Sequence, residues 1–267
     1  LFHLPPSSAR ADRLVWVDRS GKVAAPIGQP QPGLAAPRLS PDERWIAAVT
    51  MESFPQLVFH GEVWIFDAAR GQSAPLTRTL EIEYGPFWFP DSKTVLFRRF
   101  TGGGMRVISK CIETTDTESE LWQGFGDQLS STGKYLALYP IFQSRTNLAY
   151  LSLAGTNRTA IPFPEALRRA DNLQWSPNDS LLAFDSDETR QREVYVVTFP
   201  AFTNKTQVSR GGGYYLNWRP DGSELFYLTL DNRTLMSVPV KRDGALQFGE
   251  PLKVFDPMMR RVISCLP

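Results

Sequence analysis

The sequence predicts an all-β fold of repeated four-stranded antiparallel sheets, and three features support this prediction. A short turn motif recurs five times along the 267 residues, and each copy is followed by short apolar runs. The marker residues of successive copies (Pro, or Ser131 in the third copy) are 49, 41, 46 and 43 residues apart. Repeats of roughly 40–50 residues that are built from strands are typical of the blades of a β-propeller.

The turn motif has a clear physical reason. Each copy starts with a large apolar residue, continues in most cases with Ser, Pro and Asp or Asn, and ends in a turn residue. Proline presets φ for the first corner of a tight turn, and the Asp or Asn side chain accepts hydrogen bonds from backbone N–H groups just downstream. The five copies are Leu39-Ser40-Pro41-Asp42-Glu43, Trp88-Phe89-Pro90-Asp91-Ser92, Leu129-Ser130-Ser131-Thr132-Gly133, Trp175-Ser176-Pro177-Asn178-Asp179 and Trp218-Arg219-Pro220-Asp221-Gly222.

The apolar runs after each turn predict the remaining strands of each repeat. They are too short for helices, and most are rich in β-branched or aromatic residues. Second strands are expected over residues 45–49, 94–97, 135–138, 181–184 and 225–228. Third strands are expected over 63–66, 107–108, 149–151, 194–197 and 235–238, with weaker fourth strands such as 75–77 and 206–208.

The number of blades depends on the two ends of the chain. Residues 14–23 match the third and fourth strands of a blade, with no first pair before them. We therefore expect a six-bladed β-propeller whose sixth blade is a composite of both termini, with residues 2–4 or 260–265 joining the N-terminal pair, because ring closure removes exposed strand edges. The alternative is that the sixth blade is incomplete because the chain is a fragment of a longer protein.

Composition favours one globular body, so we expect a single propeller domain over residues 1–267. With 42% hydrophobic and 12% aromatic residues, the chain can bury a sizeable core. Its net charge of +1 gives no electrostatic reason to expect nucleic acid as a partner. No apolar run approaches the length of a membrane span, and no signal peptide is visible.

Residues that carry catalysis or bind metals are sparse, so we expect no enzyme activity and no cofactor. The two histidines, His3 and His60, are expected in a tail and in a loop, and neither accompanies a nucleophile motif. Two distant cysteines, Cys111 and Cys265, offer no zinc pattern and are expected to be free thiols unless adjacent blades bring them together.

One acidic group could in principle bind Ca²⁺. Its members, Asp185, Asp187 and Glu188, are expected in the loop between a second and a third strand. The regular ligand spacing of a dedicated calcium loop is missing, so we interpret the group as a solvated turn.

Candidate partner-binding residues lie where the chain enters an innermost strand. Loops at this position from several blades converge on one mouth of the central channel, and they can vary because the sheets carry the stability. The candidates are Glu81, Glu83, Tyr84, Arg168, Arg169, Asp171, Tyr214 and Tyr215. The repeated tryptophans Trp88, Trp175 and Trp218, by contrast, are expected to fill the wedge between neighbouring blades.

Residues 175–184 (WSPNDSLLAF) and 218–227 (WRPDGSELFY) resemble the repeats of the TolB-like, WD-like β-propellers of bacteria. The resemblance extends from about Leu14 to Phe255, although the third turn departs from it with Ser131-Thr132 in place of Pro-Asp. Residues 14–21 and 211–240 look closest to propellers attached to bacterial serine/threonine kinases. This resemblance implies a sensor or scaffold on the extracytoplasmic side, periplasmic or at the cell surface, tethered to a kinase or transmembrane segment outside these residues.

From these observations we expect a non-enzymatic binding module that holds a protein or peptide at the channel mouth. One alternative is the accessory propeller of a larger enzyme, either a prolyl-oligopeptidase-like peptidase or a receptor-like kinase. Another is a Ca²⁺-dependent propeller lactonase or hydrolase.

Overall fold

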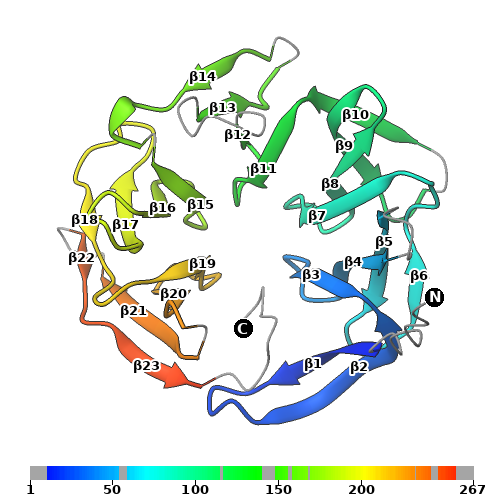
Figure 1. Cartoon of the computed structure of the whole chain (residues 1–267), viewed down its shortest axis with the longest axis horizontal. Coiled ribbons are helices and arrows are strands. Elements are labelled where there is room, and N and C mark those ends of the chain that lie inside the picture. The colour runs from blue at the N-terminus through cyan, green and yellow to red at the C-terminus, as the bar shows by residue number, and fades with distance from the viewer. Residues whose placement is uncertain are drawn as a thin grey trace, which may run out of the picture. The chain divides into compact units, whose positions relative to one another are not determined.

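A computed structural model describes residues 11–53, 59–114, 117–139, 148–155, 158–167, 169–231, 233–241 and 246–256. The fold is 59% strand and 1% helix. The chain divides into two compact units, drawn from residues 1–18 with 23–124 and from residues 19–22 with 125–267. Each unit is described by itself below, and its strands are labelled in Figure 1.

The first unit contains two sheets. One pairs β1 (Ala11–Val17) with β2 (Val23–Pro32). The other has eight strands and consists of two antiparallel groups of four, which a single parallel bridge joins between Gly61 and Ile82. Its strands are β3 (Leu34–Leu39), β4 (Trp45–Ser53), β5 (Phe59–Asp67), β6 (Ser73–Pro75), β7 (Ile82–Trp88), β8 (Thr94–Thr101), β9 (Gly104–Cys111) and β10 (Glu118–Gln123).

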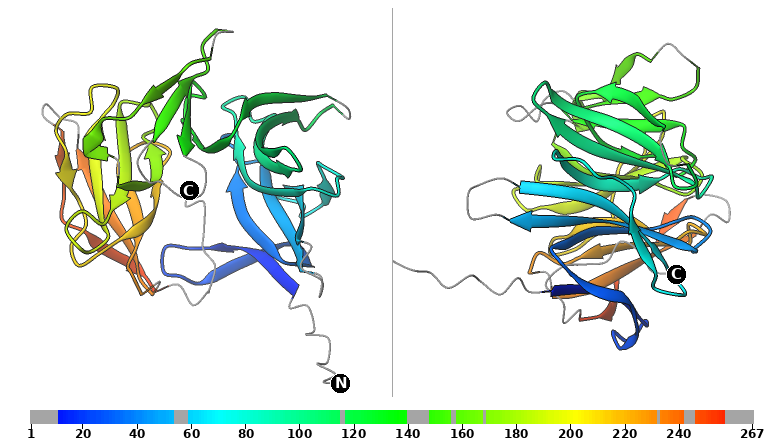
Figure 2. Two further views of the ribbon diagram at one scale, coloured as in Figure 1. Left: turned by 45° about the horizontal axis from the view of Figure 1, so that its top comes forward. Right: turned by 90° about the vertical axis from the view of Figure 1, so that its right-hand side faces the viewer.

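The second unit contains three antiparallel sheets, which Figure 2 shows from two further directions. A short 3-10 turn, η1 (Glu165–Leu167), precedes the second of them. Their strands are β11 (Phe125–Leu129), β12 (Tyr135–Tyr139), β13 (Ala149–Ser152) and β14 (Ala160–Pro162); β15 (Ala170–Trp175), β16 (Leu181–Ser186), β17 (Glu193–Thr198) and β18 (Thr206–Gln207); and β19 (Tyr214–Trp218), β20 (Glu224–Leu228), β21 (Leu235–Lys241), β22 (Gln247–Phe248) and β23 (Leu252–Phe255).

These sheets confirm the predicted fold class and the predicted strands. The first strand of each four-stranded group ends at the apolar residue of a turn motif, at Leu39, Trp88, Leu129, Trp175 or Trp218. Each group then continues as an antiparallel meander. The number of blades in a closed ring, the composite sixth blade and the single domain over 1–267 stay predictions.

The core lies between adjacent four-stranded groups within each unit. In the first unit, Val63 and Ala47 from one group of strands pack with Phe97 and Val95 from the next. In the second unit, Val194 and Val196 of one sheet pack with Leu225 and Val238 of another. Burying such side chains contributes about 1.5–3 kcal/mol each, so the interfaces between sheets carry much of the stability.

The repeated tryptophans pack as predicted. Trp175 is almost fully buried, and Trp88 and Trp218 are buried as well. The indole Nε1 of Trp88 donates to the carbonyl oxygen of Arg38 over 2.9 Å, and that of Trp218 donates to the carbonyl oxygen of Gln174 over 3.2 Å. Each of these two indoles therefore bonds to the first strand of the preceding four-stranded group in addition to filling the space between the groups.

The atypical third turn forms despite its lack of Pro-Asp. Gly133 N donates to Ser130 O over 2.9 Å, as in a regular tight turn. Asp179 of the next motif supplies the missing carboxylate: its Oδ2 accepts from Ser130 Oγ over 2.7 Å and also from Thr132 Oγ1. The departure in the third copy is thus compensated by a residue of the neighbouring sheet.

Within the described part of the chain, none of the helical structure reaches the length and hydropathy that crossing a bilayer requires.

Candidate interaction surface

The predicted binding residues that the structure describes lie at one end of their four-stranded groups. In every four-stranded group the first and second strands are antiparallel, so the start of the first strand lies beside the end of the second. The register pairs Ile82 with Phe100, Ala170 with Ser186, and Tyr214 with Leu228. We call this end of a four-stranded group its entry edge.

The entry edges of the first unit expose large apolar side chains. Leu80, just before β7, is 93% exposed, and Phe100 near the end of β8 is 45% exposed. Met51 near the end of β4 is also exposed. The backbone N–H of Met51 donates a hydrogen bond to Gly33 O over 3.0 Å. Gly33 has a φ of +65°, and a Cβ atom added to it would lie 2.0 Å from Met51 O. Only glycine can bring the two strands so close at this edge.

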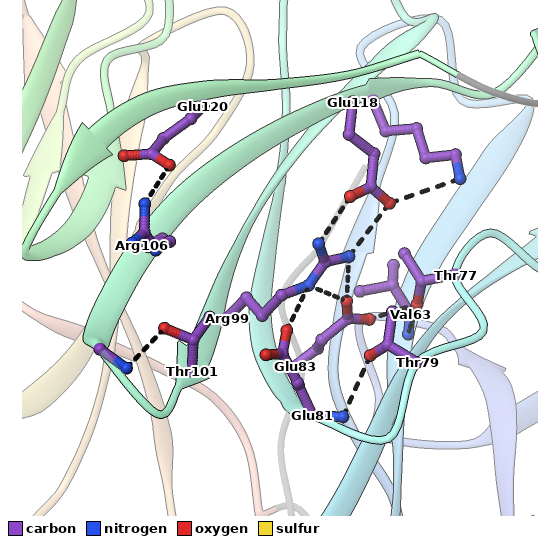
Figure 3. Close-up of polar contacts among 12 residues, drawn as sticks. Val63, Thr77, Thr79, Glu81, Glu83, Arg99, Thr101, Arg106, Glu118 and Glu120 are labelled. Atoms are coloured by element: carbon purple, nitrogen blue, oxygen red, sulfur yellow. Dashed lines mark hydrogen bonds and ion pairs between the residues drawn. The ribbon is translucent and has the colours of Figure 1, made fainter.

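An ionic cluster lies inside the entry edge that β7 and β8 form in the first unit (Figure 3). The guanidinium group of Arg99 lies 2.6 Å from Glu83 Oε1 and 2.6 Å from Glu118 Oε2, and 3.6 Å from Glu81 Oε2. Thr77 Oγ1 donates a further hydrogen bond to Glu83 and accepts one from Val63 N over 3.0 Å. The cluster therefore ties five segments of the unit to one another.

The expectation that Glu83 is a loop residue on the surface is wrong. Glu83 lies within β7 and is 0% exposed. Burial raises the pKa of its carboxyl group, and hydrogen bonds from Thr77 and Arg99 offset part of that rise. Arg99 is held cationic, because its bonds to Glu118 and Glu83 outweigh burial and raise its pKa. Fully covered by its partners, Glu83 belongs to the interior of the unit and offers no contact surface.

The two neighbours of Glu83 differ from it. Glu81 is half-buried at the mouth of the cluster. Tyr84 lies within β7, where the Arg98 guanidinium stacks 4.7 Å from its ring centroid and its hydroxyl group lies 3.5 Å from Met105 Sδ. Glu81 thus stays available to a partner, whereas Tyr84 is largely engaged by its own sheet.

The second unit places Asp171 in a different ionic group. Asp171 lies within β15 and is opposite Asp185 of β16 in the register. Arg192 contacts both carboxylates, with its Nη2 3.3 Å from Asp171 Oδ2 and its Nη1 3.2 Å from Asp185 Oδ1. Asn172 Nδ2 also donates to Asp185 Oδ2 over 2.6 Å. The interpretation of Asp185 as part of a solvated turn is wrong, because this residue is a buried strand residue whose charge Arg192 balances.

Arg169 lies beside this group and is more exposed. Its Nε is 3.2 Å from Asp187 Oδ1, and 54% of its side chain is exposed. Arg168 lies outside the described residues. Of the residues predicted in this blade, Arg169 and Asp171 therefore share one entry edge with Asp187 and Arg192.

The two tyrosines continue the same surface on the adjoining sheet. Gly213 N donates to Arg192 O over 2.9 Å, and Gly212 N donates to Glu193 Oε1 over 3.0 Å, so the entry edges of the β15–β18 and β19–β23 sheets adjoin. Tyr214 and Tyr215 lie within β19 with ring centroids 4.6 Å apart. Tyr215 is 60% exposed, and Leu230, just past β20, is 44% exposed.

Two features missed by sequence reasoning are the exposed leucines Leu80 and Leu230. A leucine beside a turn gives no signal of its own, since single exposed apolar residues are common. Their significance comes only from the strand register, which places them at entry edges.

Other candidate chemistry among the described residues is limited. No group of three or more His, Cys, Asp and Glu side chains there has an arrangement that could hold a metal ion. Cys111 has a free thiol, whereas Cys265 and His3 lie outside the described residues. His60 lies within β5 rather than in a loop. What the surface offers is hydrogen bonding, ion pairing and apolar contact.

Comparison with solved structures identifies the fold as that of a β-propeller. The chain is similar to a TolB candidate from Agrobacterium tumefaciens (TM-score 0.68, 15% identity, 91% of this chain and 87% of that one). It is also similar to TolB from Acinetobacter baumannii (0.62, 14%, 85% and 60%) and to the β-propeller domain of Cps50 (Swd1) from Myceliophteria thermophila (0.58, 11%, 81% and 70%). The match thus spans 60% of the Acinetobacter protein.

These similarities concern the fold alone. Enzymes also have similar structures, among them an oligogalacturonate lyase in complex with manganese. No protein-family model matches this sequence, and no curated protein sequence does.

Proposed function

We propose that this chain is a non-enzymatic binding module that holds a protein or peptide partner at the entry edges of its sheets. One observation supports this most directly. Of the eight large apolar side chains that are exposed among the described residues, five lie at entry edges: Met51, Leu80, Phe100, Tyr215 and Leu230. Exposed apolar groups rimmed by polar residues are typical of protein interaction sites.

The surroundings of these side chains fit such a role. Arg169, Asp171, Asp187 and Arg192 form ion pairs at the rim of the second unit's edges. Rims of this kind contribute specificity while central apolar and aromatic residues contribute most of the affinity. In a closed ring the entry edges would surround one mouth of the channel, where several loops could contact one partner.

The proposal includes a setting outside the cytoplasm. It rests on the resemblance of the repeats to TolB-like propellers and to those attached to bacterial kinases. A kinase or membrane segment elsewhere in a longer polypeptide would make the propeller its sensor.

Site-directed photo-crosslinking tests the proposed surface. A photoreactive phenylalanine analogue replaces Leu80 or Tyr215 in two variants, and Ile161 or Leu252 in two controls that are exposed away from the entry edges. After irradiation in the native cell, the first two variants should capture the same partner and the controls should not. Equal capture at all four positions, or capture only by the controls, would contradict the proposed surface.

A turnover assay tests the non-enzymatic character. Purified protein should not hydrolyse lactone or peptide substrates, with or without Ca²⁺. Turnover that one carboxylate substitution abolishes would instead favour the propeller enzyme.

A further inference from the structure

The segment between β6 and β7 is anchored by the buried hydroxyl group of Thr77. This segment carries the exposed side chain of Leu80 and, next to it, Glu81 at the mouth of the ionic cluster. Thr77 Oγ1 accepts a hydrogen bond from Val63 N over 3.0 Å and donates one to Glu83 Oε2. The hydroxyl group of Thr77 therefore fixes the start of the exposed segment to β5 and to β7 at once.

The hydrogen bonds around Glu83 require both of its carboxylate oxygens to act as acceptors. Oε2 accepts from Thr77 Oγ1, and Oε1 accepts from Arg99 Nε over 2.8 Å. A proton on Oε1 would face the arginine side chain, which has only donors. A proton on Oε2 would face the Thr77 oxygen, and the O–H group of Thr77 would then lose its acceptor in a buried site, which is costly. A neutral Glu83 is therefore incompatible with the present arrangement of Thr77.

The charged groups that surround Glu83 carry an excess of negative charge. Two further carboxylates face the cluster, Glu81 before β7 and Glu118 of β10. The cations are Arg99 of β8, which contacts all three carboxylates, and Lys110 of β9, which lies 3.5 Å from Glu118 Oε1. From β5 only a backbone N–H group takes part, and it brings no charge. Uptake of one proton would make these five side chains neutral as a group.

Glu83 is the carboxyl group that takes up this proton before Glu118 does. Burial raises the pKa of Glu83, the neighbouring charge of Glu118 adds to the rise, and the hydrogen bonds from Thr77 and Arg99 offset part of it. The pKa of Glu118 is lowered instead, chiefly by its hydrogen bonds from Arg99. As the pH falls, Glu83 therefore becomes neutral while Glu118 still holds the guanidinium group.

Loss of the charge on Glu83 acts on both ends of the segment that carries Leu80. At one end, Thr77 has to give up its present hydrogen bonds. At the other end, Arg99 Nε lies 3.6 Å from Glu81 Oε2, and this carboxylate is attracted inward once Nε no longer faces a charged Glu83. Since Leu80 lies between the two and is 93% exposed, an inward movement of the segment covers part of its side chain.

We propose that the cluster around Glu83 is an acid-sensitive switch that withdraws Leu80 and Glu81 from the entry edge and so weakens partner binding there. The withdrawal concerns the protein alone. The effect on a partner rests on the proposed function, and it names how the same surface is regulated.

Fluorine NMR tests the withdrawal. A trifluoromethyl-phenylalanine replaces Leu80 in the full chain, and its chemical shift is followed from about pH 8 to about pH 4. We expect a reversible change with a midpoint above about 4.3, the ordinary pKa of a glutamate. Glu83→Gln, neutral at every pH, should show the acid-type shift throughout and no titration. Thr77→Val removes a hydrogen bond that favours the charged Glu83, so it should move the midpoint to higher pH.

Two control variants separate Glu83 from other titrating groups of the first unit. Glu120→Gln neutralises a carboxylate of β10 that pairs with Arg106 outside the cluster, and it should leave the midpoint unchanged. His60→Gln removes the histidine of β5 and should also leave it unchanged. No shift change above the ordinary glutamate range, a titration that persists in Glu83→Gln, a midpoint that Thr77→Val leaves in place, or a titration that His60→Gln abolishes would each overturn the switch.

Photo-crosslinking at position 80 tests the effect on binding. Capture of the partner should fall at least about threefold between pH 7.5 and pH 5 in the otherwise unmodified protein and should be equally low at both pH values in Glu83→Gln. Capture that is equal at both pH values would overturn the regulation of binding while supporting the proposed surface. A fluorine titration with no partner captured at either pH would contradict the proposed function and support the switch, so the two failures are distinguishable.

Discussion

At the residue scale, the indole of Trp218 has a hydrogen bond that the indole of Trp175 lacks. Trp218 Nε1 donates to Gln174 O, whereas Trp175 Nε1 is buried with no partner among the described residues. Replacing either by phenylalanine removes similar apolar area. We expect Trp218→Phe to lower the free energy of unfolding by about 1 kcal/mol more than Trp175→Phe, the net value of one hydrogen bond. Urea denaturation measures the difference, and equal losses would show that the bond contributes nothing.

Glu224 provides a residue-scale prediction about pH. Arg19 donates two hydrogen bonds to its carboxylate, at 3.1 and 2.9 Å, and lowers its pKa below the ordinary value. A carboxyl group with a lowered folded-state pKa stabilises the fold above its unfolded pKa of about 4.3, and this contribution is lost as the pH falls through the folded value. Since Arg19 is half exposed, the pair contributes at most about 1 kcal/mol.

The matching experiment compares the unmodified protein with Arg19→Ala from pH 7 to pH 3. The difference in free energy of unfolding should be largest near pH 7 and should shrink toward zero in acid. Arg13→Ala, which removes an exposed arginine of β1, is the control and should give a small, pH-independent difference. A difference for Arg19→Ala that grows in acid would contradict the assigned pairing.

At the scale of elements, the turn before β12 depends on Asp179 from the turn before β16. Asp179 accepts from Ser130 Oγ and Thr132 Oγ1 and has φ +57°. Asp179→Ala leaves the buried Ser130 hydroxyl without this partner and places an alanine in the left-handed region. We expect a loss of about 2–3 kcal/mol in the free energy of unfolding. Asp179→Asn keeps the shape of the side chain, and asparagine adopts the left-handed backbone readily, so this variant should lose clearly less stability than Asp179→Ala. Equal losses in the two variants would show that the negative charge alone matters.

The β7 strand yields a prediction that reverses an expectation from the sequence. Charge reversal costs little at a residue in a surface loop, where the sequence places Glu83, but in the structure Glu83→Lys would bury an ammonium group beside Arg99. We expect a loss of about 3–5 kcal/mol in the free energy of unfolding, as for other broken buried ion pairs. Glu81→Lys is the matched control: it makes the same change of charge two residues earlier on a half-exposed side chain and should cost less than about 1 kcal/mol. Similar losses for both variants would contradict the buried position.

The contrast between Glu81 and Glu83 also shows how far the sequence could predict this molecule. The turn motif predicts where first strands end, because the Trp or Leu two residues before the proline (or before Ser131 in the third copy) is the last residue of each first strand. The burial of Glu83 depends on Arg99, which lies opposite it only once β7 and β8 are in register. Asp185 likewise depends on Arg192. From the sequence alone, a carboxylate in a strand is expected to face solvent. Its burial can be predicted only when the strand register shows which cationic side chain lies opposite it.

The sequence indicated only part of the candidate site, and its placement as a binding site stays a prediction. Of the five exposed apolar residues that lie at entry edges, only Tyr215 was among the candidates from the sequence. Tyr215 lies in a β-bulge with a φ of 52°. This left-handed backbone has no counterpart in the sequence, since a tyrosine does not indicate a bulge as Gly85 does. The same kind of bulge, with a left-handed residue at Ala36, Gly85 or Asn172, recurs in the first strands of three other four-stranded groups, and only the strand register shows this repeat.

At the scale of the whole molecule, the prediction of one propeller domain has a thermodynamic consequence. A closed ring should unfold as one cooperative body, whereas independent units would unfold separately. Leu96 of the first unit and Leu182 of the second are both fully buried, and replacing either by alanine should cost about 2–5 kcal/mol. In scanning calorimetry, both variants should shift a single transition whose calorimetric and van't Hoff enthalpies agree. Two resolved transitions, each shifted by only one of the variants, would show that the units unfold independently and that the single-domain prediction is wrong.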